Sequence, residues 1–220
     1  DRMYRIVNDA VKHRKVDLAR LPSAALVELQ LHQNDWFVRH ARRILQERGF
    51  EQTTATPLEK ILLSHPDATR RLRALWALHA INGLSAPLAE KALSDQDESV
   101  RGWTITLLCE HGDPTPSLIT KIHQLAENDP SALVRRRIAS AAQRLSPTTR
   151  MPVVSSLARK TEDATDPNIP LLTWYAAEGA IAADPMRALD VLSANAFAPL
   201  PEFAARRLTA AYLEKSPSAE

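Results

Sequence analysis

Apolar residues recur along most of the chain at the three- and four-residue spacing that marks one face of an α-helix. After Asn34 they fall at Val38, Ala41 and Leu45, with polar residues between them. The same spacing returns in three later segments, which contain Leu72, Leu75 and Trp76; Val100, Trp103 and Leu107; and Val134, Ile138, Ala141 and Leu145. This pattern predicts an all-α fold.

Residues that start and stop helices divide these segments into pairs. Ser23 and the Thr56-Pro57 step are typical helix starts. Gly49 and Gly112 are typical helix ends. The chain has only 5 Gly but 15 Pro, and many of the prolines fall between the helical segments. We therefore expect short helices that are joined by turns.

The second helix of each pair begins its apolar face at positions 38, 72, 100 and 134, and then at about 171 and 204. The first three steps are 34, 28 and 34 residues, and a helical pair with such a period predicts a solenoid, because each pair leaves an apolar face for its neighbour to cover. We expect a right-handed α-solenoid of about six helical pairs over residues 21–214. Residues 215–220 form a polar tail.

The first 20 residues differ from this pattern. Polar and apolar side chains alternate over 2–7, which favours a short strand, and 11–16 is a basic connector. We interpret residues 1–20 as a strand-like remnant and linker from a preceding domain. The sequence starts with Asp1, so we expect a fragment or a processed form whose signal peptide would lie upstream.

Composition and motifs argue against several functional classes. The formal net charge is +2, with no block of like charge that would indicate nucleic acid or a membrane surface, and no apolar run is long enough to span a bilayer. The lone Cys109 excludes an intrachain disulfide and a multi-cysteine metal site. The 7 His lack metal-ligand spacing, and no nucleophile elbow, phosphate loop or haem attachment motif is present. We therefore predict no catalytic, cofactor-binding or metal-binding residue in this segment.

A short phrase recurs at the turn inside each pair. It contains an aspartate and then an apolar residue followed by arginine, most completely over 129–145. The aspartates stand where helix caps stand. The phrase, Asp-Pro-x-x-x-Val-Arg in its fullest form, and its period resemble those of HEAT repeats, a family of armadillo-like α-solenoids.

In HEAT-like stacks such arginines reach the aspartate of an adjacent repeat. The resemblance therefore implies a structural ladder of Asp35, Arg39, Asp67, Arg73, Asp95, Arg101, Asp129 and Arg135. Further arginines flank these positions, and they form either a solvated helix face or a surface for an anion or a partner. They are Arg42, Arg43, Arg70, Arg71, Arg136 and Arg137.

Four tryptophans, Trp36, Trp76, Trp103 and Trp174, fall in second helices. Large rings there usually pack at the seams between pairs. The alternative is a platform on which bases stack. DNA glycosylases built from HEAT-like repeats combine such aromatics with an acidic residue in a basic groove, so a nucleic-acid-binding protein of this type is the rival function. The near-neutral net charge argues against it.

A more specific resemblance lies in residues 1–49. The Arg2-Met3-Tyr4-Arg5-Ile6 run, the 16–21 segment and above all 34–49 resemble the HEAT segment of large exported putative membrane-bound dehydrogenase proteins. In that family a propeller similar to sugar dehydrogenases comes first, and a cytochrome c domain comes later. The resemblance implies a periplasmic or exported fragment that acts as a non-catalytic spacer and protein-interaction scaffold. Its partners would be neighbouring domains of the same chain or another protein, and a stand-alone adaptor for a peptide is a third possibility.

Overall fold

The computed structural model describes residues 16–186 and 196–215, and within these ranges the chain is helical and contains no strand. The all-α prediction is confirmed. The strand and most of the connector predicted near the N-terminus, the start of the sixth pair and the polar tail beyond Lys215 lie outside the described residues.

The helices of the first half are short and follow one another closely. They are η1 (Leu18–Arg20), α1 (Ser23–Glu28), η2 (Leu29–Leu31), α2 (Asp35–Arg48), α3 (Gln52–Ser64), α4 (Ala68–Ala80), α5 (Ala86–Ala92) and α6 (Glu98–Leu108). The second half contains α7 (Pro116–Asn128), α8 (Ala132–Ala142), α9 (Pro147–Ala158), η3 (Thr161–Asp163), α10 (Ile169–Ala183) and α12 (Pro199–Lys215).

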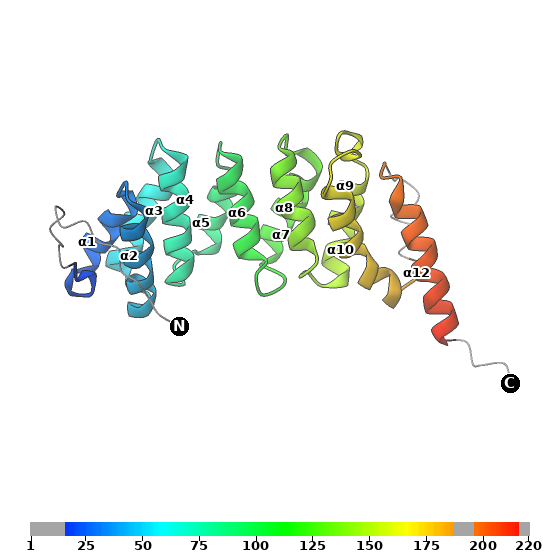
Figure 1. Ribbon diagram of the computed structural model, residues 1–220, viewed down its shortest axis with the longest axis horizontal. Helices are drawn as coiled ribbons and strands as arrows, with labels where there is room; N and C mark the ends of the chain where they lie inside the picture. The colour runs from blue at the N-terminus through cyan, green and yellow to red at the C-terminus, as the bar shows by residue number, and fades with distance from the viewer. Residues whose placement is uncertain (1–15, 187–195, 216–220) are drawn as a thin grey trace, which may run out of the picture.

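The helices stand side by side in chain order, so α1 and α12 lie at opposite ends of an elongated row of helices (Figure 1). The even-numbered helices form one row, in which α2, α4, α6, α8, α10 and α12 each pack against the next. The odd-numbered helices α1 to α9 form a second row in the same way, and each of them also packs against the even-numbered helix that follows it. Contacts are therefore made between neighbours in sequence, and the core lies between the two rows.

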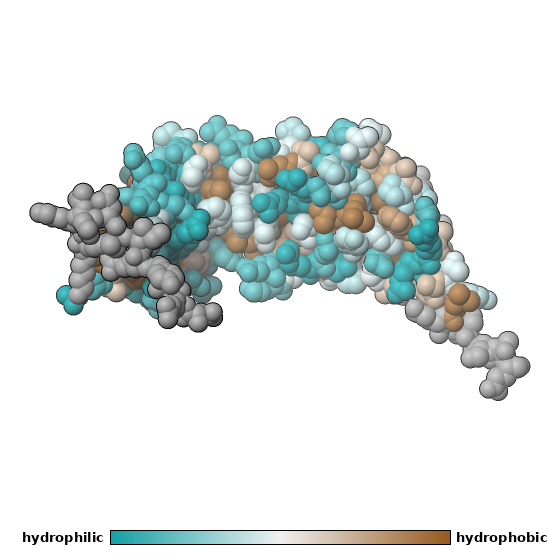
Figure 2. All heavy atoms as spheres, viewed as in Figure 1, coloured by the Kyte–Doolittle hydropathy of each residue, from teal (hydrophilic) through white to brown (hydrophobic). Residues whose placement is uncertain are grey.

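The core consists of two apolar clusters that follow one another along the rows. One joins residues from Leu18 to Val100, and the other joins residues from Ala89 to Ala204. Leu26, Leu58, Ile105 and Ile138 are among the fully buried side chains. Hydrophilic and hydrophobic residues are interspersed on the face seen in Figure 2. In the described ranges, no helix is both long and apolar enough to cross a membrane.

Two boundaries differ from the sequence prediction. Leu18, which we assigned to the linker, is buried against the first pair, and Arg48 donates hydrogen bonds to the carbonyls of Ala19 and Leu21. Residues 17–20 therefore pack with the helical body. Helix α3 begins at Gln52, so Pro57 lies inside the helix rather than at its start. Because proline has no N–H, the α-helical hydrogen bond from residue 57 to the Thr53 carbonyl is missing from α3.

Asp113, in the loop before α7, fixes the start of α9. Its carboxylate accepts hydrogen bonds from the Ser146 N–H (2.8 Å), the Ser146 hydroxyl (2.6 Å) and the Thr149 hydroxyl (2.8 Å). The hydrogen bonds from Ser146, followed by those from Thr149, lower the pKa of Asp113. A carboxylate at a helix start also compensates the N–H groups that have no partner inside the helix.

This cap makes the stability of the chain depend on pH. The folded-state pKa of Asp113 is below its unfolded value, so its contribution is complete above about pH 4 and is lost as pH falls through the folded-state pKa. We predict that Asp113→Ala lowers the free energy of unfolding by a constant amount between pH 7 and pH 5, and that the gap to wild type narrows towards pH 3. Urea denaturation at these pH values measures it. A gap that does not change with pH would contradict the assigned role of the carboxylate.

Candidate functional site

Three arginines occupy equivalent places in consecutive helical pairs. Arg71, Arg101 and Arg135 each lie six residues after the turn residue that ends the preceding helix, which is His65, Asp95 or Asp129. Each guanidinium donates back to the carbonyl of that residue, at 2.9, 2.9 and 2.7 Å. The arginine thus holds the turn of its own pair closed.

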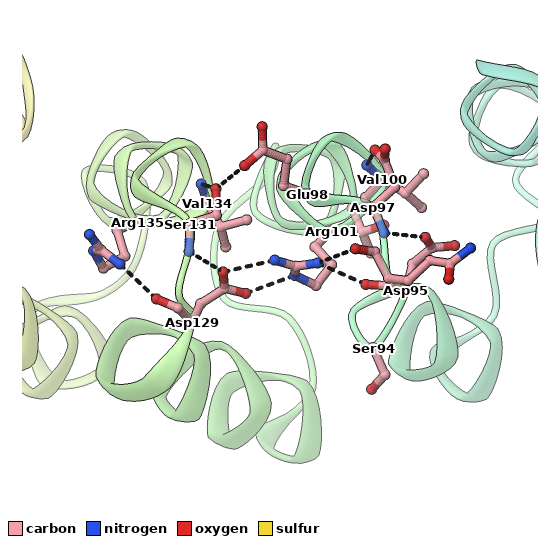
Figure 3. A network of polar contacts seen from close by, with 12 residues as sticks. Ser94, Asp95, Asp97, Glu98, Val100, Arg101, Asp129, Ser131, Val134 and Arg135 are labelled. Carbon is pink, nitrogen blue, oxygen red and sulfur yellow. Dashed lines mark hydrogen bonds and ion pairs between the residues drawn. The ribbon is translucent and has the colours of Figure 1, made fainter. Parts of the chain in front are cut away.

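The same three guanidinium groups also reach forward to the next pair. Arg101 makes two parallel hydrogen bonds to the Asp129 carboxylate, at 2.7 and 2.9 Å (Figure 3). Arg71 makes two to the Asp95 carboxylate, both at 2.8 Å. Arg135 makes two to Asp163, at 2.5 and 2.6 Å. Two parallel N–H···O bonds fix the geometry as well as the charge of a pair. We call these three pairs the arginine–aspartate ladder.

The ladder is withdrawn from solvent. The side chains of Arg101 and Asp129 are 12% and 2% exposed, and those of Arg135 and Asp163 are 5% and 2% exposed. The hydrogen bonds to their aspartates raise the pKa values of Arg71, Arg101 and Arg135 despite the opposing effect of burial. All three guanidinium groups are therefore held in the charged form.

The aspartates of the ladder have a second role, which is different from the capping role that we predicted. Asp95 and Asp129 accept the backbone N–H two residues later, that of Asp97 (2.8 Å) and that of Ser131 (2.9 Å). Asp97 and Ser131 are the residues that cap α6 and α8. The carboxylate therefore links the arginine of the previous pair to the cap of the next helix.

The first two turns make the same backbone bond with a neutral group. His65 Nδ1 accepts the Asp67 N–H at 3.0 Å, and His32 Nδ1 accepts the Asn34 N–H at 2.9 Å. No arginine of the preceding pair reaches the His65 side chain, because the equivalent position of that pair is occupied by the buried Val38. The turn residue is thus an acid where an arginine arrives from the previous pair, and a neutral acceptor where none arrives.

Two of the predicted ladder residues are placed differently. Arg39 pairs with Asp35 inside its own helix, at 2.5 Å, and its side chain is 74% exposed. Asp67 caps α4 by accepting the Thr69 N–H, and among the described residues it makes no ion pair with an arginine of a neighbouring helical pair. The Thr69 bond lowers the pKa of Asp67. Both predictions were wrong. Arg39 stays within its own helix, and Asp67 is itself the cap of α4, two residues after the turn residue His65.

The remaining first-half member, Arg73, does reach back to Asp35, at 3.2 Å, and to the His32 carbonyl, at 2.8 Å. Sequence reasoning missed Arg71, which it assigned to the surface set, and Asp163, which it assigned to a connector. The constant six-residue offset between turn residue and arginine is the signal that identifies Arg71.

Most of the other surface-set arginines are also engaged. Arg43 pairs with Glu47 at 3.4 Å, and Arg70 donates to the His32 carbonyl at 2.8 Å. Arg42 lies over the ring of Trp76, 5.2 Å from its centroid, and Arg137 lies over Trp103 at 4.8 Å. Only Arg136 of this set is exposed without an ion pair or hydrogen bond to the part of the chain that the structure describes.

The tryptophans take part in packing across helices. Trp76 meets Trp103 edge to face at 5.1 Å, so a continuous stack of Arg42, Trp76, Trp103 and Arg137 crosses four even-numbered helices. Burial lowers the pKa of Arg42. Trp174 is buried against Phe203, and Trp36 is exposed but stacks on His40 at 4.0 Å. Each ring has a partner on the protein, which removes the support for a base-stacking platform.

Gly102 allows α6 and α8 to approach where this stack crosses them. A Cβ at Gly102 would stand 3.1 Å from both the Arg137 Cγ and the Leu133 Cδ2 atoms. Because those distances are tighter than ordinary contacts, a Cβ at this position would require the Arg137 and Leu133 side chains to shift by a few tenths of an ångström.

Two observations bear on metal binding and on thiol chemistry. Within the described ranges, no group of three His, Cys, Asp or Glu side chains could hold a metal ion. Cys109 is buried, and burial raises the pKa of its thiol to about 12, so the thiolate is scarce near neutral pH. No family model matches this chain, and no curated protein matches it.

We predict that breaking one ladder pair is costly. Asp129→Ala leaves the Arg101 guanidinium buried without its counter-charge, which costs about 3–5 kcal/mol of unfolding free energy. Chemical denaturation followed by circular dichroism measures it. Arg39→Ala is the matched control, since its exposed pair within one helix is worth about 0.3–0.5 kcal/mol. Equal losses in the two variants would contradict the ladder as an energetic unit.

Replacing the arginine and its turn residue together tests whether the two must match in charge. Arg101→Val alone leaves the Asp129 carboxylate buried and unpaired, whereas Arg101→Val with Asp129→His recreates the Val38 and His65 arrangement. We expect the double variant to be more stable than Arg101→Val by roughly 1–3 kcal/mol. Arg101→Val with Asp129→Ala removes the charge but supplies no acceptor for the Ser131 N–H, so it should lie between the two. If the losses of unfolding free energy from the two single substitutions simply add in the double variant, the charge matching is refuted.

Proposed function

We propose that this chain is a right-handed α-solenoid of about six HEAT-like helical pairs that acts as a non-catalytic spacer and protein-interaction scaffold. The observation that carries the proposal is the ladder, since buried bidentate contacts bind three successive joints, from the pair of α3 and α4 to the pair of α9 and α10. A spacer needs joints that keep successive pairs in one orientation. Buried charges serve this purpose, because any other orientation leaves them uncompensated.

The even-numbered row supports the same proposal. The stack from Arg42 to Arg137 braces four helices at mid-length, while the ladder binds the turns that precede α6, α8 and α10. Two separate lines of contact resist bending better than one. A rigid row of helices presents a long surface on which other domains can be held in fixed relation.

By resemblance, we propose that the parent protein is an exported or periplasmic redox protein in which this segment holds a dehydrogenase-like propeller and a cytochrome domain in relation. The resemblance over 34–49 carries this part. It predicts a Cys-x-x-Cys-His motif downstream in the full-length gene product. A full-length sequence without that motif would overturn the parent assignment and leave the spacer proposal standing.

Rigidity is tested by a distance measurement between spin labels on α2 and α12, at Glu47→Cys and Thr209→Cys in a Cys109→Ala background. We predict a single narrow distance distribution, because the ladder and the stack brace the joints from α2 to α10, and Trp174 packs on Phe203 between α10 and α12. Adding Asp129→Ala should broaden it in a chain whose circular dichroism remains helical, and adding Arg39→Ala should not. A broad distribution in the labelled background itself would contradict the spacer.

The rival function, nucleic-acid binding, would need arginines that are already engaged with other side chains in this arrangement. Arg71, Arg101 and Arg135 are neutralised by aspartates, and Arg42 and Arg137 are engaged with tryptophans. These five guanidinium groups are therefore already engaged within the protein, whereas nucleic-acid affinity depends mostly on the neutralisation of phosphates. Strong, salt-dependent binding of duplex DNA would contradict this assignment.

A further inference from the structure

Helix α5 is much shorter than its neighbours in the odd-numbered row. It has 7 residues, whereas α3 and α7 each have 13. At about 1.5 Å per residue, the difference of six residues shortens α5 by about 9 Å. Helix α5 therefore covers a shorter length of the row than α3 and α7 do.

Two grooves flank the C-terminal end of α5. One, of about 360 Å³, lies between α3 and α5, and the other, of about 560 Å³, lies between α5 and α7. Ser94, directly after α5, lines both grooves, so they adjoin beside the Asp95 turn (Figure 3). The first groove is lined by the Arg71 and Asp95 pair of the ladder, and the second groove is lined by the next pair, Arg101 and Asp129.

Each groove has an apolar wall. Leu62 and Leu63 line the first groove, and Leu63 is 46% exposed although it is a large apolar side chain. Leu93 and Leu125 line the second groove. Leu62 and Leu93 are fully buried in the core, so Leu63 and the half-buried Leu125 are the leucines that offer contact area to apolar side chains of a ligand.

The charge of the grooves is positive. Lys91 lines the first groove and Lys121 the second, and neither makes an ion pair within the described part of the chain. The carboxylates that line the grooves are those of Asp95 and Asp129, and both are neutralised by the ladder arginines. The two lysines therefore leave each groove with one uncompensated positive charge.

Side-chain amides stand at the edges of the grooves. Gln96 lines the first groove, and Gln124 and Asn128 line the second. An amide both donates and accepts hydrogen bonds, which matches the alternating N–H and C=O groups of an extended peptide backbone.

We propose that the two grooves form one docking surface for an extended, acidic segment of a partner protein. Its acidic side chains pair with Lys91 and Lys121, its apolar side chains contact the leucines, and its backbone bonds to the amides. The inference rests on the proposed scaffold function and specifies where the scaffold binds and the chemistry of what it binds. The ladder arginines position the surface but do not touch the peptide, since their donors are committed to Asp95 and Asp129.

The test begins with a displayed library of random 12-residue peptides selected against the whole chain. A fluorescein-labelled peptide of the enriched sequence is then titrated by anisotropy. We expect acidic residues interspersed with apolar ones in the enriched peptides. Lys91→Glu with Lys121→Glu should weaken binding about tenfold or more, because two attractions become repulsions, and added salt should weaken binding of the unmodified chain.

Lys60→Glu is the matched control, because Lys60 is an exposed lysine on α3 that lines neither groove. It should leave the affinity unchanged. Circular dichroism and thermal unfolding verify that the variants keep the fold. Enrichment without acidic residues, no enrichment at all, or equal affinity of the double variant and the control would each overturn the inference. The spacer proposal is judged separately by the spin-label distances, so the two can fail independently.

Discussion

A carboxylate buried between two helical pairs must be compensated, and this requirement organises the chain. Asp129 is 5% exposed, and it meets the Arg101 guanidinium of the previous pair and the N–H that precedes helix α8. An ion pair of this kind adds little net stability compared with apolar residues of the same size, but it makes every alternative pairing expensive. The ladder therefore acts mainly on specificity: it selects one orientation between successive pairs and keeps the helix start in place.

The apolar core supplies the stability that the ladder does not. The side chains between the two rows are mostly alanine, leucine, isoleucine and valine, and such residues pack in many alternative ways. The stack of Arg42, Trp76, Trp103 and Arg137 restricts that freedom, because flat rings and planar guanidinium groups fit only in a few relative orientations. Gly102 permits the close approach that the stack needs. The ion pairs of the ladder thus fix the turns, and the stack of rings and guanidinium groups fixes the centres of the helices.

Much of the fold can be predicted from the sequence, because helix periodicity and helix caps are local. The contact between Arg101 and Asp129 also follows from the repeated phrase. The error at Leu72-Arg73 shows the limit of that method: the pair resembles Val100-Arg101 in composition, yet the equivalent arginine is Arg71, preceded by Arg70. What is constant is the distance from the turn residue and not the identity of the neighbour. The partners of Arg42 and Arg137 come from other helices, so no local pattern contains them.

The match between arginine and turn residue gives each helical pair a polarity, with a receiving side and a donating side. The pair formed by α5 and α6 receives through Asp95 and donates through Arg101, whereas the pair formed by α3 and α4 receives nothing at His65 and only donates. The first kind can be duplicated between two existing pairs without leaving a charge unpaired. The second kind can stand only where the ladder begins. The ladder can therefore lengthen by duplication of its middle pairs. It ends at a pair whose turn residue is histidine or whose arginine position holds another residue.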